Sequence, residues 1–194
     1  MQEATVQDKA PSSKKKKRKE YTKGVETMFR ITSRNHINLS EMADNKANIM
    51  ITVNTTIISL FFYLIYRFYV EGVMIIPTTL FMLTSLGSVL FAILATLPNI
   101  TKGTFSREEV MQGKTNLLFF GNFHEVSLEE FQWGMKYIME TEDAVYQSMV
   151  MDIHLLGKVL ARKYKLLRIS YTIFMIGIVI SSITFLVLMN IYGI

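Results

Sequence analysis

Three long stretches without a charged residue constrain this chain more than any other feature of its sequence. They are residues 47–66, 72–101 and 169–194, which contain 20, 30 and 26 residues. A helix of about 20 largely apolar residues is long enough to cross the roughly 30 Å hydrocarbon core of a bilayer. We therefore predict a mainly α-helical integral membrane protein with three transmembrane helices, at about 47–66, 77–97 and 169–191.

The distribution of basic residues predicts how these helices cross the membrane. Residues 1–46 hold 11 Lys and Arg residues and residues 98–168 hold nine, whereas residues 67–76 hold one and the C-terminal end holds none. Segments rich in Lys and Arg stay on the cytoplasmic side of a membrane. We therefore expect a multi-pass protein with a cytoplasmic N-terminus and an external C-terminus.

Charge and hydropathy also divide the chain into four regions. These are a basic tail at 1–23, an amphipathic segment plus a transmembrane hairpin at 24–97, a cytoplasmic sensor and stalk at 98–168, and the third transmembrane helix at 169–194. The tail is expected to be disordered, because its like charges at 14–19 repel one another and have nothing apolar to bury. We expect a topogenic role for it, with contact to anionic lipids or to nucleic acid as alternatives. Ser40 is a plausible N-cap for the first span.

The first predicted span has a polar face. At about 100° per residue, its polar side chains fall within a sector of about 100°. This face includes Asn48, Thr52, Thr55, Thr56 and Ser59. Such a face either packs against neighbouring helices or lines a water-filled path in an oligomer. Small residues for packing occur in the second span at Ser85, Ser88, Ala92 and Ala95, and in the third at Gly177, Ser181 and Thr184.

Local signals predict helices in the segment 98–168. Ser106 and Ser127 are each followed three residues later by Glu, which predicts helix starts at 107 and 128. Between them, residues 116–123 form an apolar run broken by one glycine, which fits a strand, a buried loop or an interfacial wedge. From about Thr141 a helical pattern continues into the third span, which predicts a stalk and span of about 50 residues.

The composition offers little for catalysis. The chain has no cysteine and only three histidines, which excludes a thiolate zinc site, an iron–sulfur cluster and a cysteine nucleophile. Asp152 and His154 are too few for a metal site, and the sequence contains no glycine-rich phosphate loop. We therefore expect a protein that is not an enzyme and that holds neither a metal nor a cofactor.

Three sequence blocks, in order, resemble the transmembrane effectors of the Pycsar family. The first block is F-R-I-T-S-R-N-H-I-N-L-S-E-M-A-D-N-K-A-N at residues 29–48, which includes Asn35 and the core Ala43, Asp44, Lys46 and Ala47. The others are L-L-F-F-G-N-F at 117–123 and L-G-K-V-L-A-R-K-Y-K-L-L-R at 156–168. The resemblance covers about residues 24–194.

This resemblance implies an antiphage effector of the bacterial inner membrane. A neighbouring nucleotide cyclase would make cyclic CMP or cyclic UMP on infection, and the effector would respond by disrupting the bilayer, so that infection aborts. Three spans are too few to enclose a pore, so we expect a homo-oligomer. The competing interpretation is a non-catalytic three-span scaffold that docks a cytoplasmic partner.

A cyclic pyrimidine mononucleotide needs a cation for its phosphate and an apolar face for its base. By chemistry alone, the candidates are Phe119, Phe120 and Phe123 for the base, Asn116 and Gly121 beside it, and Arg162, Lys163 and Lys165 for the phosphate. For Asp44 and Lys46 we expect instead polar contacts, between helices or between protomers, with the basic end of the stalk.

Overall fold

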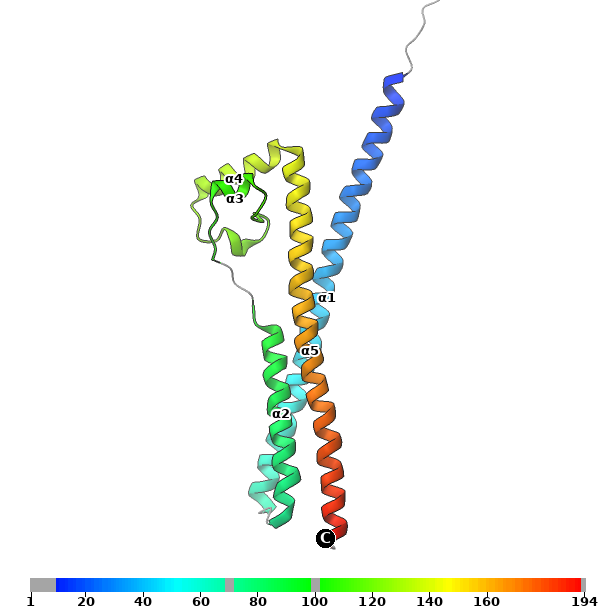
Figure 1. Ribbon diagram of the computed structural model, residues 1–194, viewed down its shortest axis with the longest axis vertical. Helices are drawn as coiled ribbons and strands as arrows, with labels where there is room; N and C mark the ends of the chain where they lie inside the picture. The colour runs from blue at the N-terminus through cyan, green and yellow to red at the C-terminus, as the bar shows by residue number, and fades with distance from the viewer. Residues whose placement is uncertain (1–9, 69–71, 99–101, 193–194) are drawn as a thin grey trace, which may run out of the picture. The chain divides into compact units, whose positions relative to one another are not determined.

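The computed structural model describes residues 10–68, 72–98 and 102–192, and in these ranges the chain is mainly helical, without a strand (Figure 1). The elements are α1 (Ala10–Phe68), η1 (Gly72–Met74), α2 (Ile75–Thr96), α3 (Arg107–Met111), η2 (Phe120–Asn122), α4 (Leu128–Glu140) and α5 (Glu142–Tyr192). The chain divides into two units. Unit 1 comprises Met1–His36 and Lys102–Leu156, and unit 2 comprises Ile37–Thr101 and Gly157–Ile194, so α1 and α5 contribute residues to both.

Small side chains hold the three helices of unit 2 together. Its core consists of Ala47 and Met50 from α1, Ala92 and Ala95 from α2, and Leu167 from α5. A Cβ atom added to Gly177 would lie 2.4 Å from Cβ of Thr84, so α5 and α2 approach closely at this glycine. Such close approach is typical of membrane helices, which associate through small residues.

The small residues that we predicted to pack are buried, with one exception. Ser85, Ser88, Ala92 and Ala95 are buried on α2, and Gly177 and Ser181 are buried on α5. Thr184 is half-buried, and its hydroxyl donates a hydrogen bond to the Ile180 carbonyl of its own helix at 2.8 Å.

The surface of unit 2 suits lipid. Among the described residues, two helical segments are long and apolar enough to cross a membrane, Gly72–Thr96 and α5. Their large apolar side chains are widely exposed, as Leu83 (62%), Leu90 (56%) and Met175 (61%) illustrate. Soluble proteins rarely expose contiguous apolar surface on this scale. The first predicted span lies within α1 and, like the orientation of the termini, stays a prediction.

Unit 1 confirms the two helix starts predicted from serine caps. The Ser106 hydroxyl accepts a hydrogen bond from the Glu109 amide while the Glu109 carboxylate accepts one from the Ser106 amide, and the Ser127 hydroxyl likewise accepts from the Glu130 amide. The Glu130 carboxylate instead binds the Arg107 guanidinium at 2.6 and 2.9 Å. These bonds lower the pKa of Glu130 and raise the pKa of Arg107.

A second cluster of apolar residues positions the segment 116–123. Leu117 is buried with Val110 of α3 and Ile138 of α4, and it lies close to Gly134, where an added Cβ would be 2.6 Å from Leu117 Cδ1. The segment is a series of turns around η2, so of the three conformations that we considered the buried loop is the nearest.

Helix α1 differs from our expectations at two places. It begins at Ala10, so residues 10–23 are helical rather than disordered, in keeping with the good helix propensity of Lys and Arg; residues 1–9 lie outside the described residues. It also runs through Ser40 without a new start, because residues 25–68 contain neither glycine nor proline to interrupt it. The long stalk and span are confirmed, since α5 is one helix of 51 residues.

Candidate functional site

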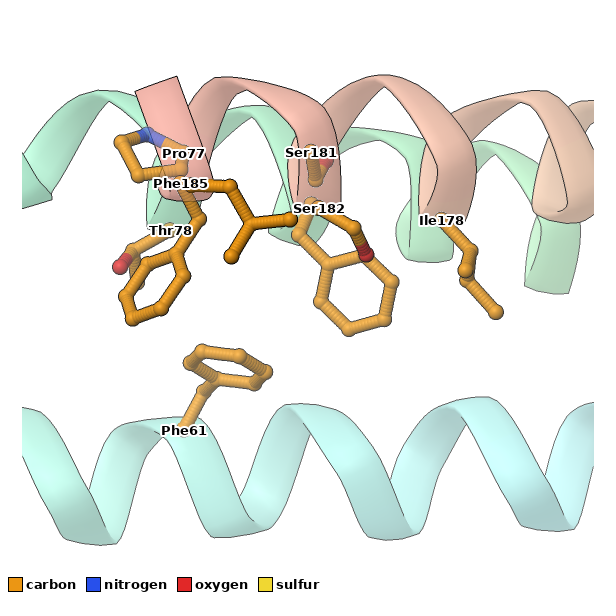
Figure 2. A pocket seen from close by; sticks show the side chains of 9 residues that line it. Phe61, Pro77, Thr78, Ile178, Ser181, Ser182 and Phe185 are labelled. Atoms are coloured by element: carbon orange, nitrogen blue, oxygen red, sulfur yellow. The ribbon is translucent and has the colours of Figure 1, made fainter. Parts of the chain in front are cut away.

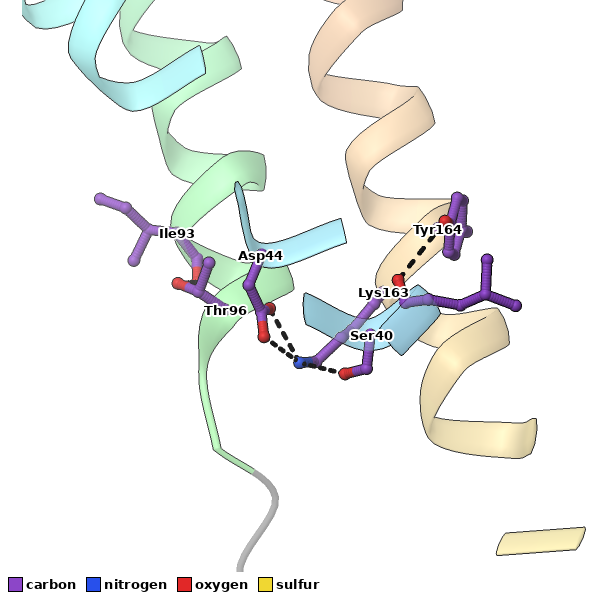
Figure 3. A network of polar contacts seen from close by, with 7 residues as sticks. Ser40, Asp44, Ile93, Thr96, Lys163 and Tyr164 are labelled. Atoms are coloured by element: carbon purple, nitrogen blue, oxygen red, sulfur yellow. Dashed lines mark hydrogen bonds and ion pairs between the residues drawn. The ribbon is translucent and has the colours of Figure 1, made fainter. Parts of the chain in front are cut away.

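An ion pair joins α1 to α5 within unit 2 (Figure 3). The Lys163 ammonium donates hydrogen bonds to both carboxylate oxygens of Asp44, at 2.8 and 2.7 Å, and to the Ser40 hydroxyl at 2.9 Å. These three acceptors satisfy all three N–H groups of the ammonium. The Lys163 side chain is 18% exposed and the Asp44 side chain 38% exposed. The pair is therefore a specific, partly buried link between two helices.

The residues around Asp44 explain the core of the first sequence block. Asp44 makes the interhelical contact with the basic end of the stalk that we expected of it. Ala43 and Ala47 on either side are 2% and 0% exposed, so their small side chains leave room for α5 and α2 to approach. Lys46 is exposed and forms no ion pair with the described residues, and Asn35 is exposed in unit 1.

A second set of polar contacts joins α2 to α5 and to α1, and we did not predict it from the sequence. The Ser170 hydroxyl donates to the Ser88 carbonyl at 2.8 Å, and the two serine hydroxyls are 3.0 Å apart. The Asn54 amide donates to the Ser88 hydroxyl at 3.4 Å and to the Met50 carbonyl at 2.8 Å. All three polar side chains are fully buried. Buried polar groups need such partners, so an asparagine within an apolar span was the signal for this link.

The polar face of α1 points away from the packed interior of unit 2. All five of its predicted residues, Asn48, Thr52, Thr55, Thr56 and Ser59, are exposed. At about 100° per residue, this face lies about 150° from the buried stripe of Ala43, Ala47, Met50 and Asn54. The face therefore does not pack inside one chain.

The hydroxyls of this polar face are bonded to their own helix. Thr55 donates to the Ile51 carbonyl at 2.7 Å, Thr56 to the Thr52 carbonyl at 2.8 Å, and Ser59 to the Thr55 carbonyl at 2.8 Å. Serine and threonine side chains commonly make this bond one turn back along a helix. This bond gives the hydroxyl proton an acceptor, so no partner from another helix is needed.

Unit 1 contains a cavity of about 200 Å³ that combines a cation, an aromatic ring and hydrogen-bonding groups. Helix α1 supplies Glu26, Phe29, Arg30 and Ser33, the segment 116–123 supplies Leu118, and α5 supplies Met149, Asp152 and Ile153. The Asn116 side chain, 1% exposed, donates to Asp152 Oδ1 at 2.8 Å and accepts from the Leu118 amide at 2.9 Å. Through these two bonds Asn116 fixes the positions of Asp152 and Leu118, which line the cavity.

None of the residues that we expected to bind a ligand lines this cavity. Phe119 packs on Phe120 with ring centroids 4.9 Å apart, Phe123 packs on Phe131 at 4.4 Å, and Gly121 is buried. Arg162, Lys163 and Lys165 lie in unit 2, and Lys163 already has Asp44 as its partner. Asn116 reaches the cavity only through its neighbours.

Phe29 and Arg30, which line the cavity, are not among the ligand residues that we predicted from the sequence. These two residues open the first of the three resembling blocks, and that position was the signal that could have singled them out. No group of three or more His, Asp or Glu side chains that could hold a metal ion occurs in the ranges that the structure describes.

Comparison with known proteins identifies one relationship. A family model described as PycTM, Pycsar effector protein domain, matches residues 27–189, which include the ion pair, the polar face and all but one of the cavity residues. No curated protein and no solved structure shows significant similarity to the chain.

Proposed function

Because the chain belongs to the Pycsar effector family, over residues 27–189, we propose that it is a membrane effector of antiphage defence that a cyclic pyrimidine mononucleotide activates. The observation that carries the proposal is the family match itself, which spans both the apolar helices and the cavity of unit 1. The function needs ligand binding and a change of conformation, and it needs no catalytic step.

The cavity of unit 1 is the nucleotide site in this proposal. Its volume, about 200 Å³, lies below the roughly 300–1,000 Å³ of pockets for drug-sized ligands, which favours a small ligand. The Arg30 guanidinium suits the single negative charge of a cyclic phosphate, because it can donate two parallel hydrogen bonds. Phe29 offers an apolar face for the base, and the Asp152 carboxylate accepts from an amino or hydroxyl group.

Helices α1 and α5 each contribute residues both to the cavity of unit 1 and to unit 2, so they can connect ligand binding to unit 2. Residues of α1 and α5 form most of the cavity wall, and the same helices carry Asp44 and Lys163 in unit 2. A ligand shifts a conformational equilibrium only through its different affinities for the two states. We propose that bound nucleotide favours a different arrangement of α1 and α5, in which the contact between Asp44 and Lys163 changes.

The membrane-disrupting form is a homo-oligomer. The polar face of α1 lies opposite the stripe that packs within the chain, so it is free to contact a second copy. One chain offers three spans in this proposal, at about 47–66, 77–97 and 169–191, and three helices cannot enclose a water-filled path. Several copies with the polar face turned inward can do so.

Measuring the membrane potential of bacteria that express the chain tests whether the nucleotide activates it. Co-expression of an active pyrimidine nucleotide cyclase is expected to depolarise the cells, measured with a potential-sensitive dye, whereas a catalytically inactive cyclase leaves the potential unchanged. Equal depolarisation with both cyclases would contradict activation by the nucleotide. No depolarisation, together with a stoichiometric soluble partner in pull-downs from uninfected cells, would favour the scaffold interpretation.

The proposed orientation is tested by alkaline phosphatase fusions, which are active only outside the cytoplasm. A fusion at the C-terminus is expected to be active, and a fusion after Lys102 inactive, because residues 98–168 carry nine basic residues that hold them in the cytoplasm. The reverse pattern of activities would overturn the proposed topology.

A further inference from the structure

The exposed side of α1 carries a row of residues at alternating intervals of three and four along the helix. In unit 1 the row consists of Tyr21, Gly24, Met28, Ile31 and Asn35, all of them exposed. The large apolar side chains among them are more than half exposed, Tyr21 at 75%, Met28 at 56% and Ile31 at 61%. This spacing is that of the contact positions of a coiled coil, so the row has the pattern of a surface for another helix.

The same spacing continues in the part of α1 that belongs to unit 2, because α1 is one helix over Ala10–Phe68. The next residues of the row are Asn38, Met42, Asn45 and Ile49, and all are exposed. The row then enters the polar face at Thr52, Thr56 and Ser59. We call this row, from Tyr21 to Ser59, the outer seam. It connects residues that precede the first predicted span with the polar face inside that span.

The opposite side of α1 is taken up by helices of the same chain. Ala47 and Asn54 are fully buried on that side. Further along, Phe61 points toward the neighbouring helices of unit 2 (Figure 2), and its ring centroid is 5.4 Å from that of Phe81 of α2. The outer seam is therefore the side of α1 that is free to contact another helix.

The outer seam accounts for two residues of the first sequence block to which the contacts inside the chain assign no role. Asn35 occupies a seam position, and an asparagine at such a position fixes the register of parallel helices in a coiled coil. Lys46 and Glu41 lie beside the seam, and both are exposed. An acid and a base five residues apart in this setting face each other across two parallel helices. An exposed ion pair contributes at most about 1 kcal/mol, so this pair favours one register while the seam itself supplies the contact.

A second copy of α1 offers the chemistry that the outer seam needs. Copies that insert in a membrane in one orientation present their α1 helices in parallel, with the same residues at the same depth. Asn35, Asn38 and Asn45 then lie beside their counterparts, and amide side chains both donate and accept hydrogen bonds. Glu41 likewise lies beside Lys46 of a second copy. A lipid tail offers neither the hydrogen bonds nor the opposite charge.

We propose that the α1 helices of different copies associate in parallel along the outer seam, which then faces the common axis of the oligomer. This inference rests on the proposed function, in which several copies turn the polar face inward, and it identifies the contact that brings the copies together. The contact begins before the predicted span, at Met28 and Ile31, so assembly does not depend on the polar face alone.

The test uses single cysteine variants of the full chain, which has no cysteine of its own. Met42→Cys lies on the outer seam. Ile37→Cys is the matched control, because the two native side chains are 50% and 48% exposed and, at about 100° per residue, point about 140° apart. A short, membrane-permeable bis-maleimide is added to bacteria that co-express the chain and the active cyclase. Met42→Cys is expected to give a cross-linked dimer, and Ile37→Cys is expected to stay monomeric.

A charge placed on the seam gives a second, independent measurement. Ile31→Asp puts like charges together at the centre of the contact and is expected to abolish both the cross-linking of Met42→Cys and depolarisation, whereas Ile37→Asp is expected to retain both. Circular dichroism of each purified variant checks that helix content is retained.

The outcomes separate failure of this inference from failure of the proposed function. Equal cross-linking of Met42→Cys and Ile37→Cys, or none from either, would overturn the seam even in cells that depolarise. Cross-linking of Met42→Cys alone in cells that do not depolarise would support the seam and contradict the membrane-disrupting role. A product whose mass is not a multiple of the chain's own would assign the seam to a different protein and overturn the proposal.

Discussion

Replacing Asp44 with alanine is expected to abolish nucleotide-dependent depolarisation while nucleotide affinity stays within about twofold. The change leaves the Lys163 ammonium, only 18% exposed, without its carboxylate. Loss of a hydrogen bond to a charged group costs about 1.5–3 kcal/mol, and this loss falls on the contact between α1 and α5. Because the cavity of unit 1 is untouched, binding measured by isothermal titration calorimetry is expected to survive.

A charge exchange separates the ion pair from other effects of the mutation. The single variants Asp44→Lys and Lys163→Asp each place like charges together and are expected to be inactive, and the double variant is expected to regain depolarisation. Glu41→Ala is the matched control, because Glu41 is an exposed acid on the same helix, less than one turn from Asp44. Loss of nucleotide binding in a folded Asp44→Ala protein would contradict a coupling role and place Asp44 in the ligand site.

Replacing Arg30 with alanine is expected to weaken binding of the cognate cyclic nucleotide about 10- to 150-fold. The estimate follows from the loss of hydrogen bonds between a charged donor and the phosphate, worth about 1.5–3 kcal/mol. The same titration with purified protein measures the effect, using cyclic CMP and cyclic UMP as ligands. Depolarisation of cells is expected to fall in parallel.

Arg34→Ala is the control for this prediction, because Arg34 is an exposed cation one turn further along α1 and is not part of the cavity wall. Phe120→Ala discriminates between the cavity and the site expected from the sequence, since the Phe120 ring is 60% exposed and lies outside the wall. An unaffected Arg30→Ala protein, with binding lost in Phe120→Ala or Lys165→Ala, would return the ligand to the residues first expected.

Local signals made much of this fold predictable. The starts of α3 and α4 follow from serine caps, and α5 follows from a long stretch without a strong helix breaker. None of these three predictions requires knowledge of distant residues. Ser40 shows the limit of such reasoning, because a residue type that favours an N-cap serves here as an acceptor for Lys163. Only the position of α5 determines which role the hydroxyl takes.

The candidate site was less predictable because distant segments build it. Phe29, Leu118 and Asp152 meet in one cavity although about 90 residues separate the first two in sequence. The amphipathic pattern at the start of the segment 24–97 could not show that residues of α5 lie across a cavity from Phe29. Likewise, the choice between phosphate and carboxylate as the partner of Lys163 depends on packing between helices far apart in the chain.

The hydroxyls that bond to their own helix on α1 bear on how the proposed membrane effector would stay inactive before infection. Thr55, Thr56 and Ser59 each satisfy their proton one turn back, so a single copy can face hydrocarbon with little penalty. Rotation about one side-chain bond is enough to turn such a hydroxyl toward water when copies gather. The inactive and the membrane-disrupting forms would then differ in the rotamers of the same few side chains. An uninfected cell would carry the inactive form without damage to its membrane.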